Sequence, residues 1–413
     1  MDLGRIKDHL LQCEALGVAT PSLSKLVCAD CVEDTELRAL VTQYGASAQC
    51  SYCERITSVA SFDVVIERIA LCVSRYYTDP ANELPYCGAE GGYLGPMYDT
   101  NEVLSDLGLD LDNSFLFDDI VASFDISEWA EVNWATLRPA ERRRHGWERF
   151  KEATMHSRRY TFWSMQVDEE DPWHPDSLPA GRMLTEIQTV IESCQIIKRL
   201  APGTPLWRVR KHDISDIPNT PKDFSAPPNS VATQANRMSP AGISMFYGAE
   251  DLKTAVEETL PARACRKRTA SAACFRTMFE LNVLDLVDLP ALPSCFTEQP
   301  VPHREELRFL RIFAHEISKP VEDNEARSIK YVPTQAFTEH VRWQMKTGSG
   351  EPIDGICYRS SRTGRRSYVL FCDNQHCIAG EPGSRSGRWL DFDSATIKRD
   401  LRRARRKRTT SLA

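Results

Sequence analysis

The sequence predicts an α+β fold, with a mostly helical N-terminal region that carries a cysteine cluster and a C-terminal domain of mixed strands and helices. Up to about residue 200, apolar residues recur at steps of three and four, as on one face of a helix. After Pro202 the pattern changes to short β-prone runs separated by turns rich in Pro and Gly. A chain of 413 residues with 42% hydrophobic content is long enough for two or three domains.

We expect four segments along the chain. Residues 1–57 form a helix and a four-cysteine zinc unit, and residues 58–200 form a helical region. Residues 201–392 form the mixed domain, and residues 393–413 form a basic tail. No internal repeat is present.

Two Cys-x-x-Cys pairs follow a helical pattern at Asp2–Leu16. The pairs are Cys28 with Cys31 and Cys50 with Cys53, and eighteen residues separate them. This spacing is typical of a tetrahedral four-thiolate zinc site, in which each short turn places two sulfurs on the metal. A site with four protein ligands has no open position, so the zinc is expected to be structural. Coincidental buried thiols or a redox pair remain the alternatives.

Apolar spacing predicts further helices in the N-terminal region. They are expected at Val59–Tyr77, Phe115–Ala130, Pro139–His156 and Leu178–Leu200. The segment Pro80–Asp99 is rich in Gly, Pro and Tyr and is expected to be a long irregular connection.

The C-terminal domain is expected to contain a small split sheet. Strands are predicted at Leu206–Arg210, Phe279–Val287, Gly355–Tyr358 and Tyr368–Phe371. Helices are predicted at Glu250–Leu260 and Gln335–Trp343.

Five short motifs in this domain carry cationic, carboxylate and hydroxyl groups, which together suit an anionic nucleotide. They are Arg208, Arg237–Ala249, Thr254–Glu258, Tyr331–Gln335 and Asp354–Ser361. In order and spacing these motifs resemble the RES domain, a family named after an arginine, a glutamate and a serine. The resemblance covers about residues 200–390. It implies a fold similar to the ADP-ribosyltransferases and an enzyme that consumes NAD+ or transfers its ADP-ribose, as the toxin of a toxin–antitoxin pair.

The resemblance also assigns roles to individual residues. It implies that Arg208 and Arg237 bind the diphosphate or ribose of NAD+, and that Glu258 accepts the ribose 2'-hydroxyl and steadies the developing cation. Ser360 would orient the nicotinamide-ribose side. Family members often have Arg-Trp-Asn where this chain has Arg237-Met238-Ser239, so binding is expected to differ in detail.

Two tyrosines join this group as NAD+-binding residues. The resemblance implies that Tyr247 stacks on or bonds to the nicotinamide end, and it includes Tyr331 in the binding set. From the residues alone, both could be core tyrosines, and Arg208 could be part of a structural ion pair. Glu257 lies beside Glu258 and could be solvated or paired on the helix surface, as either glutamate could.

A second possible activity lies in the N-terminal region. Arg138 with His145, and Arg149 with His156, each have six residues between them, a spacing that resembles HEPN ribonucleases. RES domains are sometimes preceded by a HEPN-like helical region with a Cys-x-x-Cys unit. A solvated basic face is the alternative, because other arginines crowd this stretch.

Charge and composition bound the partners and the compartment. The net charge is −7, and Lys398–Arg408 holds eight basic residues and one acid, which leaves about −14 for the rest. The tail could therefore contact a nucleic acid while the body repels one. A non-enzymatic adaptor that holds nucleic acid or an antitoxin is a third class of function. An antitoxin or regulatory protein and a second copy of the chain are the expected protein partners. No membrane-length apolar run or signal peptide is present, so we expect a cytoplasmic protein with reduced thiols.

Overall fold

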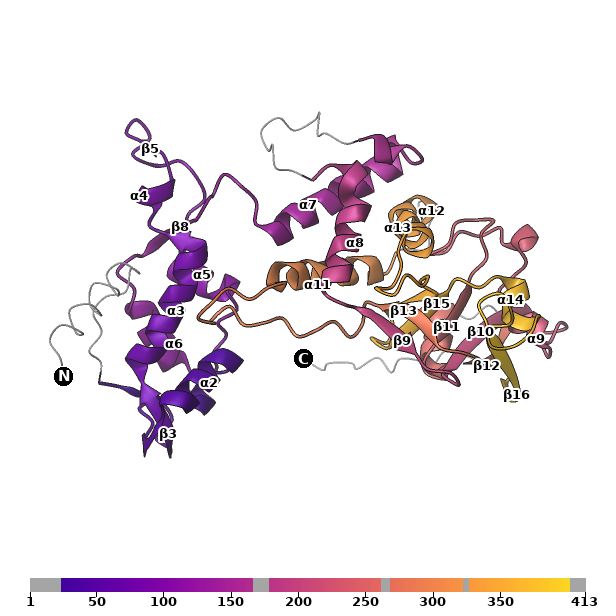
Figure 1. The fold of residues 1–413 in the computed structure, drawn as a ribbon, viewed down its shortest axis with the longest axis horizontal. Coiled ribbons are helices and arrows are strands. Elements are labelled where there is room, and N and C mark those ends of the chain that lie inside the picture. Colours follow the sequence, from indigo (N-terminus) through magenta and orange to yellow (C-terminus); the bar gives the residue numbers. More distant parts are fainter. Residues whose placement is uncertain (1–23, 166–177, 261–267, 322–326, 402–413) are drawn as a thin grey trace, which may run out of the picture. The chain divides into compact units, whose positions relative to one another are not determined.

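A computed structural model of the chain describes residues 24–165, 178–260, 268–321 and 327–401. The expected helix at Asp2–Leu16 and most of the basic tail lie outside these residues. The chain divides into two compact units (Figure 1). Unit 1 comprises Met1–Leu137 and Leu292–Arg304, and unit 2 comprises Arg138–Ala291 and Glu305–Ala413. None of the helices in the described ranges has the length and apolar character needed to cross a membrane.

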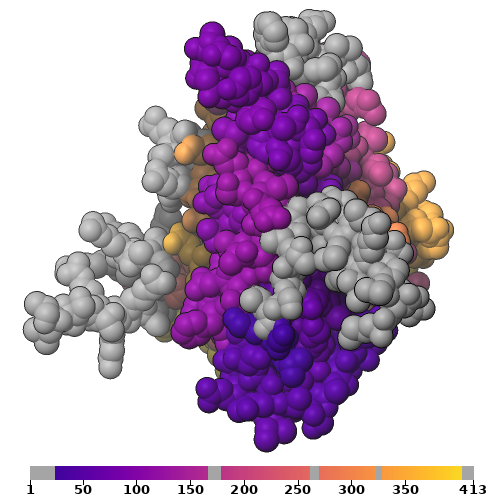
Figure 2. All heavy atoms as spheres, turned by 90° about the vertical axis from the view of Figure 1, so that its left-hand side faces the viewer, coloured from indigo at the N-terminus to yellow at the C-terminus, as the bar shows by residue number. Residues whose placement is uncertain are grey.

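Unit 1 packs two helices against a small antiparallel sheet, and its indigo and purple atoms fill much of the face in Figure 2. The strands follow the order β1 (Leu26–Cys28), β3 (Ile56–Ser61) and β2 (Ala46–Gln49), and helix α2 spans Thr35–Tyr44. Helix α3 (Phe62–Tyr76) begins where the Ser61 side chain accepts from the Asp63 N–H. Its buried face carries Phe62, Val65, Ile66, Ile69, Ala70, Cys72 and Val73.

The second part of unit 1 is less helical than its apolar spacing predicts. The helix expected at Phe115–Ala130 ends early, as α6 (Ser114–Ala122), and is followed by strand β8 (Glu128–Glu131). β8 pairs with β4 (Tyr77–Thr78) and β7 (Tyr98–Asp99), which buries Trp129 against the core. Pairing with distant strands therefore overrides the local helical pattern. The remaining elements are α4 (Pro80–Glu83), β5 (Tyr86–Cys87), β6 (Gly92–Tyr93) and α5 (Thr100–Asp106).

Unit 1 also contains a segment from the C-terminal half of the sequence, Leu292–Arg304. Phe296 is 1% exposed and belongs to the core around α3. The Cys295 thiol donates to the Leu107 carbonyl oxygen at 3.2 Å, and the Arg75 guanidinium donates to the backbone carbonyl oxygens of Cys295 and Glu298. The segment is thus built into the core of this unit.

Unit 2 is organised by an eight-stranded sheet. Its order is β16-β12-β10-β11-β15-β14-β13-β9, and all pairs are antiparallel except β13 with β14. The strands are β9 (Ile197–Leu200), β10 (Pro205–Asp213), β11 (Phe246–Ala249), β12 (Arg268–Thr277), β13 (Leu281–Asp285), β14 (Gly355–Arg359), β15 (Arg366–Leu370) and β16 (Leu390–Lys398).

The sheet is nearly divided between β10 and β11. These neighbours are paired only at Trp207 and Ala249, whereas β10 and β12 pair along nine residues. Beyond Trp207, the edge of β10 that faces β11 is therefore open. Gly248 permits the close approach at the junction, because a Cβ there would lie 3.1 Å from the Leu206 Cβ. The α+β class and the strands expected after Pro202 are confirmed.

Helices cover both faces of the sheet (Figure 1). One face packs against α7 (Pro139–Glu152), α8 (Met183–Ser193), α11 (Arg304–Ser318) and α13 (Val332–Trp343). The other packs against α9 (Pro221–Phe224) and α14 (Asn374–Ile378). Two more helices are α10 (Leu252–Thr259) and α12 (Arg327–Lys330). Consecutive residues of β14 point to opposite faces, with Ile356 in one core and Cys357 in the other.

The helix predicted at Leu178–Leu200 is also shorter than expected. α8 ends at Ser193, and Gln195 has a positive φ of 51°, a left-handed conformation that stops the helix. The chain then continues as β9, which pairs with β13 and forms one edge of the sheet. The apolar residues of this segment thus serve two different elements.

Candidate functional site: a cavity at the divided sheet

A cavity of ≈590 Å³ opens in unit 2, and its walls include the junction of β10 and β11. Helix α10, the loop before β11 and Tyr331 also contribute to the walls, as do Tyr358 of β14 and Ser367 of β15. Five of the six residues expected in an NAD+ site line this cavity. They are Arg208, Arg237, Tyr247, Glu258 and Tyr331. The sixth, Ser360, contacts it through Glu258.

Arg208 lies on β10 at the divided part of the sheet. Its Nη1 donates to the Tyr247 carbonyl oxygen at 3.0 Å, and its Cζ lies 5.0 Å from the centre of the Phe246 ring. Burial lowers the pKa of this guanidinium, although arginine stays protonated in proteins. No carboxylate in the described ranges pairs with it. The alternative role of Arg208, in a structural ion pair, therefore finds no partner among the described residues, and the positive charge is available to an anion.

Arg237 lies on the loop before β11. Its Nη1 donates to the Ile317 carbonyl oxygen, and its Cζ lies 5.8 Å from the centre of the Tyr331 ring. Within the described part of the chain it too has no carboxylate partner. The cavity thus brings together two guanidinium groups that have no carboxylate partner in the described ranges, which favours an anionic ligand.

Glu258 provides the carboxylate of the site, near the C-terminal end of α10. This helix is fixed at its other end because the Asp251 side chain accepts from the Thr254 N–H at 2.7 Å. The Ser360 hydroxyl donates to Glu258 Oε1, and Ser360 itself is 1% exposed. The Ser360 oxygen also accepts from the N–H of Thr363 at 3.3 Å, in the turn after β14. The serine therefore holds the carboxylate in one orientation.

A hydroxyl pair forms another part of the wall. The Ser239 Oγ and Tyr247 Oη atoms lie 2.9 Å apart. Burial raises the pKa of Tyr247 to about 12, so its hydroxyl is neutral near pH 7 and can donate a hydrogen bond. Burial, with the nearby Glu258 charge as a smaller cause, also raises the pKa of Tyr358, which lines the same cavity.

Two buried serines line the cavity with hydroxyls that no described group bonds. They are Ser244 and Ser367. A buried polar group without a partner costs free energy unless a ligand or water satisfies it. Both hydroxyls are therefore suited to contact a polar ligand.

Sequence reasoning missed several of these residues. Tyr358 follows Asp354-Gly355 in a quoted motif, and the period of two along β14 could have placed it on the same face as Ile356. No sequence signal distinguishes Ser244 or Ser367 from any other serine, because their place in the wall depends on the folded loop and sheet.

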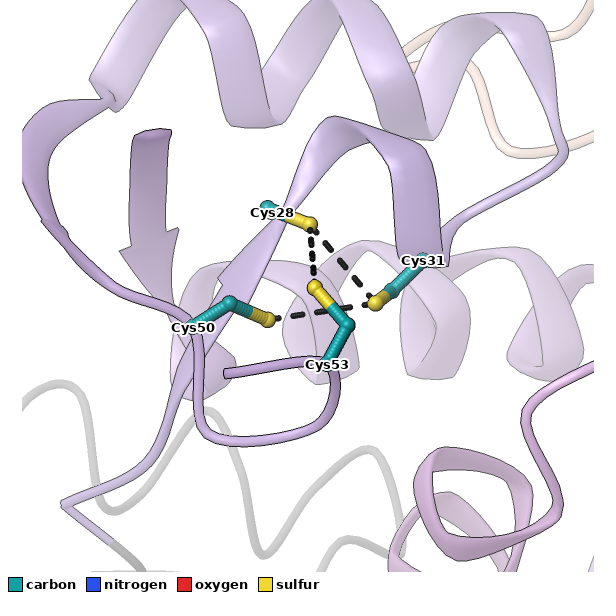
Figure 3. Close-up of side chains that lie close together, drawn as sticks. All are labelled: Cys28, Cys31, Cys50 and Cys53. Atoms are coloured by element: carbon teal, nitrogen blue, oxygen red, sulfur yellow. Dashed lines mark hydrogen bonds between the residues drawn. The ribbon is translucent and has the colours of Figure 1, made fainter. Parts of the chain in front are cut away.

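The four predicted zinc ligands also come together, in unit 1. Three are buried and Cys53 is partly buried, and all four sulfurs lie within 4.8 Å of one another. The Sγ atom of Cys28 lies 3.6 Å from that of Cys31 and 3.5 Å from that of Cys53. The Sγ atoms of Cys31 and Cys50 are 3.8 Å apart. Their side chains point toward one another from a 3-10 turn and a facing loop (Figure 3). Tetrahedral thiolates at about 2.3 Å from Zn²⁺ have sulfurs about 3.8 Å apart, so a metal such as zinc fits.

Surrounding groups favour the thiolate form at one position of this cluster. Hydrogen bonding by the Arg55 backbone lowers the pKa of Cys53 to about 6. Arg55 in turn pairs with Asp30, with Nη1 and Oδ2 3.0 Å apart. Thiolate is the form that binds a metal.

The Arg-x6-His pairs lie on α7 and directly beside its two ends, in unit 2. The buried side of α7 carries Trp147 and Phe150, which pack in the core with helices α11 and α13. His145 and His156 are exposed, and the Nε2 atom of His145 lies 3.3 Å from the Arg144 Nη2 atom. The helix thus has a core-packing side as well as a basic exposed side.

Two family comparisons match this chain. Residues 43–168 match the HEPN/RES N-terminal domain 1, and residues 205–393 match the RES domain. The chain therefore contains a RES domain. The RES match spans every candidate residue of the cavity, and the N-terminal match includes Cys50 and Cys53. No curated protein and no solved structure matches the chain.

Proposed function

We propose that the RES domain breaks the bond between nicotinamide and ribose in NAD+. The observation that carries this proposal is the cavity itself. It is lined by two guanidinium groups that have no carboxylate partner among the described residues, and by a carboxylate that a buried serine holds. The volume of ≈590 Å³ lies within the range typical of small-molecule and cofactor sites. Membership of the RES family supports NAD+ as the dinucleotide.

Binding rests on the cationic and aromatic residues. Arg208 and Arg237 bind the diphosphate or an adjoining ribose, because guanidinium groups form bidentate hydrogen bonds with phosphate oxygens. Tyr247 contacts the nicotinamide end, and Tyr331 supports the guanidinium of Arg237 from the cavity wall.

Bond cleavage rests on Glu258 and Ser360. Nicotinamide carries a positive charge in NAD+ and leaves as a neutral molecule with the electron pair of the C–N bond. The ribose carbon becomes oxocarbenium-like, as in glycoside cleavage. The Glu258 carboxylate accepts the ribose 2'-hydroxyl and stabilises the positive charge that develops on the sugar. Ser360 keeps the carboxylate in place for that role. Water, phosphate or a protein side chain then bonds to the ribose carbon and releases its proton to solvent.

Loss of NAD+ or modification of a target would make the chain a toxin, which an antitoxin or regulatory protein restrains.

The four cysteines of unit 1 would hold a structural Zn²⁺, since all four tetrahedral positions are filled by protein ligands. Zinc bound there would tie the turn at Cys28–Cys31 to the loop at Cys50–Cys53. Contact of the basic tail with nucleic acid remains a secondary proposal that rests on its charge.

A direct test is incubation of the purified protein with NAD+, with and without phosphate, and identification of the products by mass spectrometry. Free nicotinamide should form together with ADP-ribose, its phosphorylated form or a modified protein. Free ADP-ribose in both buffers would assign hydrolysis. Expression of the chain should also lower cellular NAD+ and arrest growth. Intact NAD+ after incubation, or arrest with unchanged NAD+, would contradict the proposal.

A further inference from the structure

We propose that Gln335 and Thr334 of helix α13 are positioning residues for the cavity. Both hydrogen-bond to the backbone of the four-residue turn Asn236–Ser239 and hold it in place. The inference rests on the proposed NAD+ cleavage. It concerns residues that do not line the cavity themselves, since neither side chain is part of its wall.

The turn carries two groups of the candidate site and has little structure of its own. Its backbone closes through one hydrogen bond, from the Asn236 N–H to the Ser239 carbonyl oxygen at 2.8 Å. No helix or strand includes these residues. The conformation of the turn therefore depends on what packs against it.

Gln335 supplies most of this support through one side-chain amide. Its Nε2 donates to the Asn236 carbonyl oxygen at 2.8 Å and to the Ser239 carbonyl oxygen at 3.3 Å. Gln335 is 7% exposed, so water does not compete freely for these bonds. One amide thus joins the first and the last residue of the turn.

Threonines on the same helix hold the middle of the turn. The Thr334 Oγ1 donates to the Arg237 carbonyl oxygen at 2.7 Å. Thr338, one helical turn further, is fully buried, with its Oγ1 3.2 Å from the Met238 sulfur. All four residues of the turn therefore contact polar side chains of α13.

The hydrogen bonds from α13 fix the positions of two groups in the cavity wall. The backbone of Arg237 is fixed by α13, so its guanidinium can reach the Ile317 carbonyl oxygen and the cavity together. The backbone of Ser239 is fixed by Gln335, so its hydroxyl meets the Tyr247 hydroxyl at 2.9 Å. A shift of the turn would therefore move the Arg237 guanidinium and disturb the hydroxyl pair of Ser239 and Tyr247. Displacements near 1 Å in an active site can lower reaction rates by about 100-fold.

The test is the variant Gln335→Met, which keeps similar length and removes both donors. The kcat/KM for NAD+ should fall by about tenfold or more, mainly through KM, because Arg237 is proposed to bind NAD+ before and during the reaction. In an Arg237→Ala background the same substitution should lower kcat/KM by a smaller factor. Amide hydrogen exchange in residues 236–239 should accelerate, whereas exchange in β13 should not change.

The matched control is Gln344→Met, an exposed glutamine just after the same helix. Its kinetics and its exchange should match the unmodified protein. An unchanged kcat/KM in Gln335→Met, or an equal loss in both backgrounds, would overturn the positioning role. If the unmodified protein leaves NAD+ intact, the proposed function fails instead. Hydrogen exchange then still shows whether Gln335 orders the turn.

Discussion

Two adjacent glutamates near the end of α10 differ in what surrounds them. Glu258 lines the cavity and accepts the Ser360 hydrogen bond, whereas Glu257 is not part of the cavity wall. Successive residues point about 100° apart around a helix, so the two side chains leave α10 in different directions. The carboxylate role that we propose therefore depends on where the side chain points as well as on its chemistry.

Glu258→Gln should lower kcat for NAD+ cleavage by about 100- to 1,000-fold, because the amide removes the negative charge that stabilises the developing cation. The change keeps the size of the side chain, and KM should move much less. Glu257→Gln is the control and should keep nearly full activity. Steady-state kinetics on both purified variants decides the matter, and equal losses in the two would place the acid role elsewhere.

Motif residues near the site have different tasks, which the sequence does not separate. Asp354 is 1% exposed and accepts from the Asn282 N–H at 2.8 Å and from Arg385 Nε at 2.7 Å. Gly355 is required because a Cβ there would lie 2.5 Å from the Val369 carbonyl oxygen. These two residues fix the start of β14, whereas Tyr358 further along the strand lines the cavity. A motif thus predicts that a segment contributes to the site. The contacts in the folded chain show which of its residues are structural and which line the cavity.

At the scale of the element, the local spacing of apolar residues predicts helices well where only one face of the helix is buried. α3, α10 and α13 form close to the expected residues, because each has an apolar stripe and a solvent-facing side. Prediction fails at β8 and β9, where strand pairing with distant residues decides the conformation. The cavity has the same origin, since the single pairing of β10 with β11 depends on the whole sheet.

The cysteine cluster connects the buried turn at Cys28–Cys31 to a loop and a neighbouring strand that bury little apolar surface. β2 has no buried residue, and the loop between Cys50 and Cys53 is only partly covered. Metal–ligand bonds would therefore supply much of the local stability.

Cys31→Ser should lose the metal and lower the melting temperature of unit 1 by roughly 5 °C or more. Metal content by atomic emission and thermal unfolding by circular dichroism measure the two effects. Cys87→Ser is the control, because Cys87 lies in the β5 hairpin outside the cluster, and it should keep one metal per chain. Full metal content in Cys31→Ser would show that this thiol is not a ligand.

At the scale of the whole molecule, the family match and the compact units do not share boundaries. The RES match covers residues 205–393, yet Leu292–Arg304 within it belongs to unit 1. Conversely, α7 lies within the N-terminal match at residues 43–168 but belongs to unit 2. Each unit thus takes part of its core from the sequence of the other domain, which a linear reading of domains could not predict.

Phe296 gives the sharpest test of this exchange. Phe296→Ala should destabilise unit 1 by about 3–5 kcal/mol, because it leaves a cavity in the core around α3. Phe115 is 75% exposed in the same unit, so Phe115→Ala controls for the loss of an aromatic ring. Hydrogen exchange of α3 amides in the full-length chain reports the stability of unit 1 directly. Faster exchange in Phe296→Ala and no change in Phe115→Ala would establish that a segment inside the RES sequence completes the N-terminal core, and equal exchange in both would refute it.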